Sequence, residues 1–322
     1  MKRIVSVLVL LSLLLAGTAA HADQPAAANL DLSGLAGVPT HYLRYDAAFY
    51  EAEDEHPGTV VKMKYTTEQY DKSYKKTLNV YLPYGYDENG TERYPVLYFF
   101  HGRGCNPDTL IGNPQTKNAF DHMISSGLVK PFILVSPTYY YDMRKQLVDY
   151  DRFVLEMRGE IMPLVEGTYR TYAETPDEEG FRASRDQRAI SGFSMGSFTT
   201  WNLFSGMLDV SATFLPFSGA FSLIEGGTVT LGSIRQAVDA CDGDYFIYMA
   251  CGGEEDLAFE GCSALAREMR ADKAYFSYGT ERGTNHFFYV QSDNIHQDLT
   301  SRYYLFNAFA DGVLWPAAPG RE

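Results

Sequence analysis

Short apolar runs recur along the chain with the composition of strands that are buried on both faces. Residues 95–100 read PVLYFF, a continuous apolar run, and five similar short runs follow. A strand with one exposed face alternates apolar and polar positions, whereas a strand inside a parallel sheet does not. The later runs cover residues 132–136, 188–191, 213–218, 245–251 and 273–278. The pattern therefore predicts a mostly parallel sheet built from these segments.

Two earlier segments, residues 59–65 and 76–82, are also predicted to be strands. Both are rich in residues that favour strands, and the turn-forming sequence DENG at 87–90 follows the second. They are expected to add two strands to the sheet before the strand at 95–100.

Helical segments separate several of the predicted strands. Residues 149–166 carry apolar side chains at spacings of four, four and three, which suit one face of a helix. These side chains belong to Phe153, Met157, Ile161 and Leu164. Residues 198–208, 232–240 and 260–271 are also compatible with helices. Strands that alternate with helices predict an α/β fold in which helices cover both faces of a mostly parallel central sheet.

The first 22 residues have the pattern of a secretory signal peptide. Met1-Lys2-Arg3 is basic, residues 4–16 are almost wholly apolar, and Ala20-His21-Ala22 fits the cleavage pattern. The apolar run is shorter than the ~20 residues that a membrane-spanning helix needs. We expect a secreted, extracytoplasmic protein that is cleaved after Ala22 and then has no membrane association. The predicted organisation is a signal peptide at 1–22, an Ala-rich tether at 23–45, a catalytic domain at 46–315 and a C-terminal tail at 316–322.

The charge of the chain narrows the classes of partner. The formal net charge is −14, and it becomes −16 without Lys2 and Arg3, because residues 1–22 contain no acidic side chain. An acidic surface repels nucleic acid and anionic membranes. A neutral polymer or a small molecule is therefore the expected partner.

The chain contains four cysteines, Cys105, Cys241, Cys251 and Cys262. After export they could pair in three ways, among which the sequence does not choose. Their spacing is not that of a zinc site, and no His/Glu pair has the spacing of metal ligands. We therefore expect no metal and no other cofactor.

Residues 188–201 read RAISGFSMGSFTTW and contain a G-x-S-x-G motif at Gly192–Gly196. In this motif the serine occupies a tight turn between a strand and a helix, and its neighbours must be small. A predicted strand precedes the motif and a helix-compatible segment follows it, which is the context that the motif requires. Ser194 is therefore predicted to be a nucleophile, and an ordinary strand–helix turn is the alternative.

A serine nucleophile needs a general base, and in hydrolases with this motif the chain order is serine, acid, histidine. Only His286 and His296 follow Ser194. His286 comes just after the last predicted strand, whereas His296 stands in the polar segment DNIHQ. His286 is therefore predicted to be the base.

The acid is expected after the strand at 245–251, where Glu254, Glu255 and Asp256 compete. Asp256 follows a plausible glycine turn and stands just before the next helix, so it is the predicted acid. Its task would be to orient the imidazole and to stabilise its cationic form.

An oxyanion hole needs backbone N–H groups that point at the developing negative charge. Met195, directly after the nucleophile, is expected to supply one of them. The loop HGRGC at 101–105 follows the strand at 95–100, and its glycines allow a tight turn. Arg103 is the predicted second donor through its backbone, with His101 as a structural support for the loop.

The block GFSMG together with Thr199-Thr200-Trp201 resembles the feruloyl esterase modules of bacterial xylanases, in carbohydrate esterase family one. The resemblance runs from about residue 76 to about residue 310. It includes the sequences FHG at 100–102, PTY at 137–139, FSG at 217–219 and GEED at 253–256, and His286 with the two aromatic residues after it. It implies an α/β-hydrolase fold with Ser194, Asp256 and His286 as the catalytic triad.

The same resemblance implies a substrate class. It suggests hydrolysis of ester-linked ferulate, or a related acyl group, on xylan of the plant cell wall, with an acylated polysaccharide, an oligosaccharide or a small ester as partner. Tyr139 and Phe287 could stack on a phenolic ring or a sugar. The sequence departs from the family where the oxyanion loop reads GRGC instead of a run of glycines, and where Ser197 replaces a common glycine.

Other functions remain open on the same scaffold. An acetyl xylan esterase, a siderophore esterase and an acyltransferase would use the same nucleophile on a different acyl group. The GRGC loop also resembles that of S-formylglutathione hydrolases, which are cytosolic, in conflict with the signal sequence. A binding protein on a degenerate hydrolase scaffold is the non-enzymatic alternative, and the presence of all three triad residue types argues against it.

Overall fold

The computed structural model describes residues 40–41, 47–53, 55–220, 229–281, 283, 286–292, 295–297 and 300–316. The predicted signal peptide, most of the predicted tether and nearly all of the predicted tail lie outside these residues. The chain divides into a unit Met1–Ala36 and a unit Gly37–Glu322. All that follows concerns the second unit.

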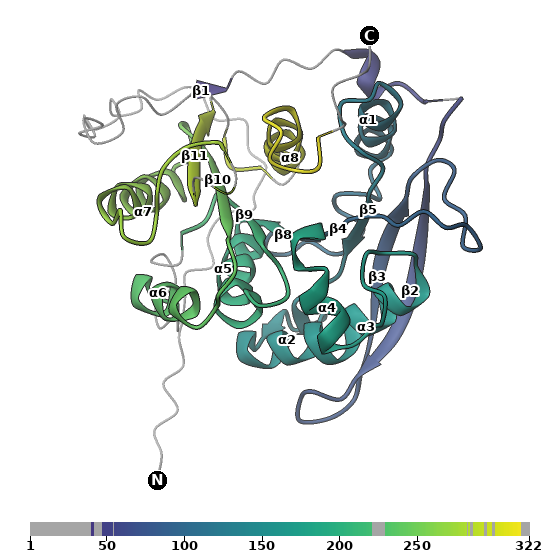
Figure 1. Ribbon diagram of the computed structural model, residues 1–322, viewed down its shortest axis with the longest axis horizontal. Coiled ribbons are helices and arrows are strands. Elements are labelled where there is room, and N and C mark those ends of the chain that lie inside the picture. Colours follow the sequence, from purple (N-terminus) through teal and green to yellow (C-terminus); the bar gives the residue numbers. More distant parts are fainter. Residues whose placement is uncertain are drawn as a thin grey trace, which may run out of the picture. The chain divides into compact units, whose positions relative to one another are not determined.

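Within the described residues, nine strands form one sheet in the order β1-β11-β10-β9-β8-β4-β5-β3-β2 (Figure 1). The pairs from β1 through β5 are parallel, and β3 joins β5 and β2 in antiparallel pairs. The predicted mostly parallel sheet is therefore confirmed. The strands are β1 (Thr40–His41), β2 (Thr59–Thr67), β3 (Tyr74–Leu82), β4 (Val96–Phe100), β5 (Ile133–Ser136), β8 (Arg188–Phe193), β9 (Thr213–Phe217), β10 (Phe246–Gly252) and β11 (Phe287–Ser292).

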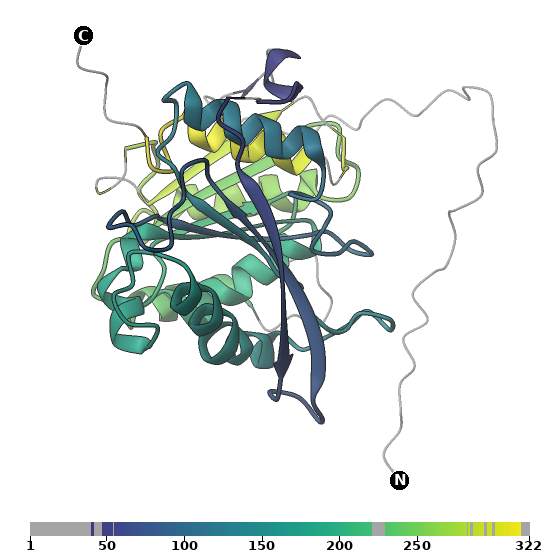
Figure 2. The ribbon, with the colours of Figure 1, turned by 90° about the vertical axis from the view of Figure 1, so that its right-hand side faces the viewer.

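Helices cover both faces of the sheet. Figure 2 shows α1 and α8 side by side on one face and α2, α3 and α5 on the other. The described helices are α1 (Pro114–Ser125), α2 (Tyr150–Glu156), α3 (Met162–Thr168), α4 (Glu178–Ala183), α5 (Met195–Met207), α6 (Leu231–Asp239), α7 (Phe259–Ala271) and α8 (Thr300–Ala310). None of the helices in this part of the chain is long and apolar enough to cross a lipid bilayer.

The core beneath α1 and α8 is rich in aromatic rings. Phe120 of α1 packs edge-on against Phe306 of α8 and Phe132, with both pairs of ring centroids 5.6 Å apart. All three side chains are at most 2% exposed. This packing holds α8 against the rest of the core. In the sequence, α8 is the next element after the last strand.

The predicted strand at 273–278 is wrong. The last strand is β11, and Tyr278 forms only an isolated bridge with Phe287. Only Phe276 of this segment is buried, and a short run of strand-like composition does not by itself distinguish a strand from a connection. The helices α1, α4 and α8 are also absent from the sequence prediction.

The predicted helix at 149–166 is present, but a π-helical turn, Met157–Ile161, separates α2 from α3. The wider turn shifts the buried face by one residue. Val165 is therefore completely buried, whereas the predicted Leu164 is only partly so. Residues 40–41 differ from the prediction as well: they fall in the predicted tether, yet they pair with β11 at the edge of the sheet.

Candidate active site

Ser194 stands at the turn between β8 and α5 with φ 56° and ψ −116°. A positive φ is uncommon for a residue with a side chain and is a strained conformation. The flanking glycines make the turn possible: a Cβ on Gly192 would lie 2.3 Å from the Gly196 carbonyl oxygen, and one on Gly196 would lie 2.1 Å from that of Phe100. The predicted strand–turn–helix context of the G-x-S-x-G motif is therefore present.

Ser194 is hydrogen bonded to His296, and His296 to Glu255. The distance from Ser194 Oγ to His296 Nε2 is 2.9 Å, and that from His296 Nδ1 to Glu255 Oε2 is 2.8 Å. Ser194 follows β8, Glu255 follows β10 and His296 follows β11. The three side chains meet because the carboxyl ends of parallel strands lie at one edge of the sheet.

The protonation pattern of this chain of hydrogen bonds follows from Glu255. Burial by itself raises the pKa of Glu255, but hydrogen bonds from His296, Ser218 and Tyr304 outweigh it, and the pKa is lower than usual. The carboxylate is therefore ionised at neutral pH and can only accept. His296 Nδ1 must then carry the proton, which leaves Nε2 free to accept the proton of the Ser194 hydroxyl.

The prediction of His286 as the base is wrong. His286 precedes β11, and its carbonyl accepts a hydrogen bond from the amide of Ile247 at the start of β10. Its ring stacks on Tyr245 at 4.8 Å, and Nδ1 is 3.2 Å from Ser277 Oγ. These contacts lie at the amino edge of the parallel strands, opposite Ser194. The error comes from the segment 273–278, which was assigned as the last strand and put His286 after a strand instead of before one.

The prediction of Asp256 as the acid is wrong too. Asp256 is exposed, as is Glu254, whereas Glu255 is 2% exposed and faces His296. A signal for both residues exists in the sequence once the strands are assigned correctly. Glu255 stands three residues after the last residue of β10, and His296 stands four residues after the last residue of β11.

The loop after β4 is held from beneath by buried polar groups. His101 is 1% exposed, and its Nδ1 donates to the carbonyl of Gly102 at 2.8 Å. Its Nε2 lies 2.9 Å from Thr138 Oγ1. The hydroxyl of Tyr139 donates to the same Gly102 carbonyl at 3.1 Å. The supporting role expected of His101 agrees with this geometry.

The two amides predicted to be oxyanion donors lie on the turn that carries Ser194 and on the loop after β4. Gly196 contacts the carbonyls of Phe100 and His101, so the loop after β4 lies against the turn that carries Ser194. Among the described residues, neither the Arg103 amide nor the Met195 amide has a hydrogen-bond acceptor. The oxyanion role of the two amides stays a prediction.

Neither of the two predicted substrate contacts is placed to meet a substrate. Tyr139 is completely buried and supports the oxyanion loop with its hydroxyl. Phe287 is also completely buried, at the amino edge of β11, and its ring packs on Tyr278 at 5.5 Å. Both predictions are wrong. Two exposed aliphatic residues adjoin the triad along the chain: Ile295, 48% exposed, directly precedes His296, and Leu257, 73% exposed, follows Glu255 by two residues.

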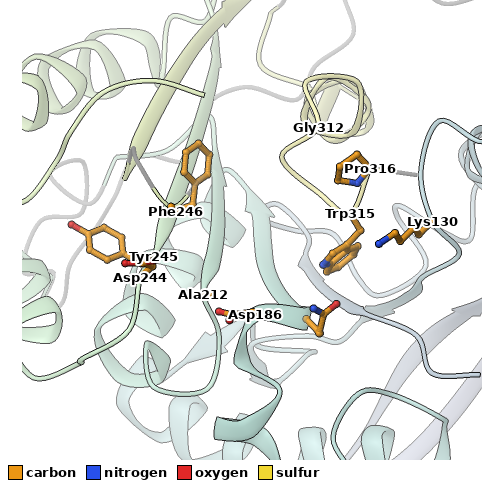
Figure 3. A pocket seen from close by; sticks show the side chains of 11 residues that line it. Lys130, Asp186, Ala212, Asp244, Tyr245, Phe246, Gly312, Trp315 and Pro316 are labelled. Carbon is orange, nitrogen blue, oxygen red and sulfur yellow. The ribbon is translucent and has the colours of Figure 1, made fainter. Parts of the chain in front are cut away.

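A cavity of about 490 Å³ opens at the amino edge of the sheet, away from Ser194. Figure 3 shows Tyr245 and Phe246 on one side of it and Trp315 and Lys130 on the other. Tyr245 is the residue on which His286 stacks. His286 therefore belongs to the surroundings of this cavity and not to those of the nucleophile.

The part of the chain that the structure describes holds no cluster of three or more potential metal ligands. No disulfide bond joins Cys105, Cys241, Cys251 or Cys262, all of which lie in the described residues.

Comparison with known proteins identifies the family of this chain. The model of the Esterase family matches residues 73–205. The chain is 31% identical over 292 residues to endo-1,4-beta-xylanase Y of Acetivibrio thermocellus. The aligned region covers 87% of this chain and 26% of that protein. It is 27% identical over 254 residues to an endo-1,4-beta-xylanase/feruloyl esterase of Xylanibacter ruminicola. The aligned region covers 76% of this chain and 31% of that protein. The chain thus spans less than a third of the length of these curated relatives.

Solved structures match over almost their whole length. A mutant of the feruloyl esterase module from Clostridium thermocellum, complexed with sinapinate, superposes with a TM-score of 0.73 at 28% identity and covers 88% of this chain and 97% of that one. A second structure, of a protein called FAE, is 30% identical, with a TM-score of 0.72 and coverage of 84% and 94%. A ferulic acid esterase from Anaeromyces mucronatus, 18% identical with a TM-score of 0.62, shares the fold. The predicted α/β-hydrolase fold is confirmed.

Proposed function

This chain belongs to the Esterase family, and from that premise we propose that it is a serine carboxylic-ester hydrolase that releases ferulate or a related phenolic acid from acylated plant xylan. The observation that carries the proposal is the hydrogen-bonded chain Ser194–His296–Glu255 at the strained turn of an esterase fold. A nucleophile, a base and an orienting acid in this arrangement are the parts that acyl transfer requires.

We assign each residue a step in the reaction. Ser194 Oγ attacks the ester carbonyl carbon while its proton passes to His296 Nε2, and a tetrahedral oxyanion forms. The amides of Met195 and Arg103 stabilise this oxyanion. The intermediate then collapses: the ester C–O bond breaks, and His296 gives its proton to the departing alcohol oxygen. The product of this half-reaction is an acyl group on Ser194.

Deacylation repeats the same steps with water. His296 Nε2 takes a proton from a water molecule, whose oxygen attacks the acyl carbon. The second oxyanion collapses, Ser194 recovers its proton from His296, and the carboxylic acid leaves. Glu255 remains ionised throughout and stabilises the imidazolium each time it forms.

Three observations support a phenolic ester of a neutral polysaccharide as the substrate. The exposed side chains of Ile295 and Leu257 offer apolar surface beside the base and the acid. The net charge of −14 disfavours anionic polymers. The relatives that the chain resembles are xylanases and feruloyl esterases by name. The acyl group distinguishes this proposal from an acetyl xylan esterase, a siderophore esterase or an acyltransferase with the same machinery.

A panel of esters tests the proposal. We expect turnover of methyl ferulate to exceed that of acetylated xylan and of a short nitrophenyl ester, measured as kcat/KM. The Ser194→Ala variant should lose nearly all turnover of each ester, and a fluorophosphonate probe should label the wild type but not the variant. Ser233→Ala, at a partly exposed serine in the capping box of α6, is the matched control and should react like the wild type. Preference for acetylated xylan would overturn the acyl assignment, and failure of the probe to label Ser194 would overturn the hydrolase itself.

We further propose that the protein is exported and cleaved after Ala22. The basic residues, the apolar run and the Ala20-His21-Ala22 sequence support this proposal. The amino-terminal sequence of the protein recovered from the culture medium or periplasm should begin at Asp23. Retention of the intact chain in the cytoplasm would contradict it.

A further inference from the structure

The carboxylate of Glu255 is held on the side away from His296 by two side chains and one amide. The hydroxyl of Tyr304, in α8, donates to Glu255 Oε1 at 2.7 Å, and that of Ser218 donates to the same oxygen at 2.6 Å. The Gly252 amide adds a third hydrogen bond at 2.9 Å. Oε1 is thereby fixed, and Oε2 is left to meet His296.

Tyr304 also contacts the segments that carry the other two members of the triad. Its ring packs on that of Phe217 at 5.4 Å, and the carbonyl of Phe217 accepts the amide of Ser194 at 2.9 Å. Ser292, the last residue of β11 before the segment with His296, donates to the Tyr304 hydroxyl at 3.5 Å. Tyr304 is completely buried, so these contacts are shielded from water.

Ser218 shows a conformation that fits an anchoring task. Its φ is 50°, which is strained for a residue with a side chain. The turn is held by a hydrogen bond from its amide to the carbonyl of Ala250 at 2.8 Å. This strained turn directs the hydroxyl of Ser218 to Glu255.

We propose that Tyr304 is a positioning residue of the triad: it fixes the Glu255 carboxylate and, through it, the orientation of the His296 imidazole, with Ser218 as the second anchor. The inference rests on the proposed esterase function. A glutamate has one more rotatable bond than an aspartate, so more contacts are needed to hold it in one orientation. Burial and the charge of Glu255 raise the pKa of Tyr304 well above its usual value, so the phenol remains a donor at every working pH.

The test replaces Tyr304 by Phe, which removes the hydroxyl and keeps the ring. We expect kcat for methyl ferulate to fall roughly tenfold with little change in KM, because the base is less well aligned in the transition state. We also expect the acid limb of the kcat/KM profile to move to higher pH, by roughly half a unit. Without the Tyr304 hydroxyl, the Glu255 carboxylate accepts one hydrogen bond fewer. Its negative charge then stabilises the protonated form of His296 more strongly.

Tyr81→Phe is the matched control. Tyr81 is a completely buried tyrosine whose hydroxyl donates to a buried carboxylate, Asp121 Oδ1, at 2.8 Å. It lies on β3, which β4 and β5 separate from β8 in the sheet. This variant loses an equivalent hydrogen bond, and we expect lower thermal stability with kcat and the acid limb unchanged. If both variants moved the acid limb equally, the shift would come from a general loss of packing and not from the contact with Glu255. That result would overturn the proposal.

A double variant shows whether Tyr304 acts through Glu255. In the Glu255→Gln background, Tyr304→Phe should cause no further loss of kcat, because the charge that it positions is absent. Losses that multiply would overturn the proposal. If Tyr304→Phe fails to fold, Ser218→Ala takes its place, with the same direction of shift expected.

Titration of His296 by NMR separates this inference from the proposed function, because it needs no substrate. A raised His296 pKa in Tyr304→Phe supports the positioning role even if the wild type hydrolyses none of the esters tested. An unchanged His296 pKa in an otherwise active enzyme overturns the positioning role alone.

Discussion

His296 Nε2 lies 2.9 Å from Ser194 Oγ, although 102 positions separate the two residues in the sequence. The sheet brings them together, because both follow the carboxyl end of a parallel strand. His286 stands at the other end of β11, whose six residues at ~3.3 Å each span roughly 20 Å. One histidine therefore reaches the nucleophile and the other does not.

Replacing the two histidines in turn distinguishes them. His296→Ala removes the base, and we expect kcat to fall by about 10⁴-fold or more, as for other residues that act as a unit with a serine nucleophile. His286→Ala removes only the ring that stacks on Tyr245, and kcat/KM should stay within about twofold of the wild type. Both values come from initial rates on methyl ferulate. Loss of activity in His286→Ala with retention in His296→Ala would refute the observed pairing.

The neighbouring carboxylates allow an equally direct comparison. Glu255→Gln keeps the shape of the acid but removes its charge, so the imidazolium is no longer stabilised and the imidazole can adopt the wrong tautomer. We expect kcat to fall by about 10³- to 10⁴-fold. Asp256→Asn, one residue further on and exposed, is the matched control and should retain wild-type kcat. If kcat fell equally in the two variants, neither carboxylate could be identified as the acid of the triad.

The part of the site that local sequence determines was predictable, and the part that depends on strand assignment was not. The turn at Ser194 follows from glycine spacing within five residues: Gly192 relieves a contact inside the turn, and Gly196 relieves one with the end of β4. The base depends on which edge of the sheet a histidine reaches. The segment 273–278 has a strand-like composition without being a strand, so counting it as one places the predicted base at the wrong edge.

Tyr304 and Ser218 were not predictable for a different reason. Tyr304 lies on α8, which carries no clear separation of apolar and polar faces because most of its side chains are buried. Ser218 acts through a backbone conformation that its sequence does not reveal. The choice between Glu255 and Asp256 depends on burial, and the two residues are adjacent and chemically alike. Only the three-dimensional packing distinguishes them.

The lowered pKa of Glu255 predicts how stability depends on pH. The folded-state pKa is below the value of 4.5 for the free side chain, because hydrogen bonds to the carboxylate outweigh its burial. The stabilisation from this group is therefore fully present above pH 4.5 and is lost as the pH falls through the folded-state pKa. The difference in Tm between the wild type and Glu255→Gln should therefore shrink as the pH falls below about pH 4.5. Thermal unfolding at a series of pH values measures it, and a difference that grows in acid would reverse the sign of the inferred shift.

The exposed side chain next to the base predicts how the enzyme selects its acyl group. Ile295 directly precedes His296 and is 48% exposed, so a phenolic ring bound at Ser194 can cover it. Burying such a side chain contributes on the order of 1 kcal/mol, which corresponds to about a fivefold change in KM. Ile295→Ser should therefore raise KM for methyl ferulate about fivefold and leave KM for a nitrophenyl acetate nearly unchanged, because an acetyl group is too small to reach the side chain. Leu155→Ser, at a 54% exposed aliphatic residue on α2, is the control and should change neither value. If KM rose equally for both esters in Ile295→Ser, the side chain would support the loop of His296 instead of contacting the acyl group.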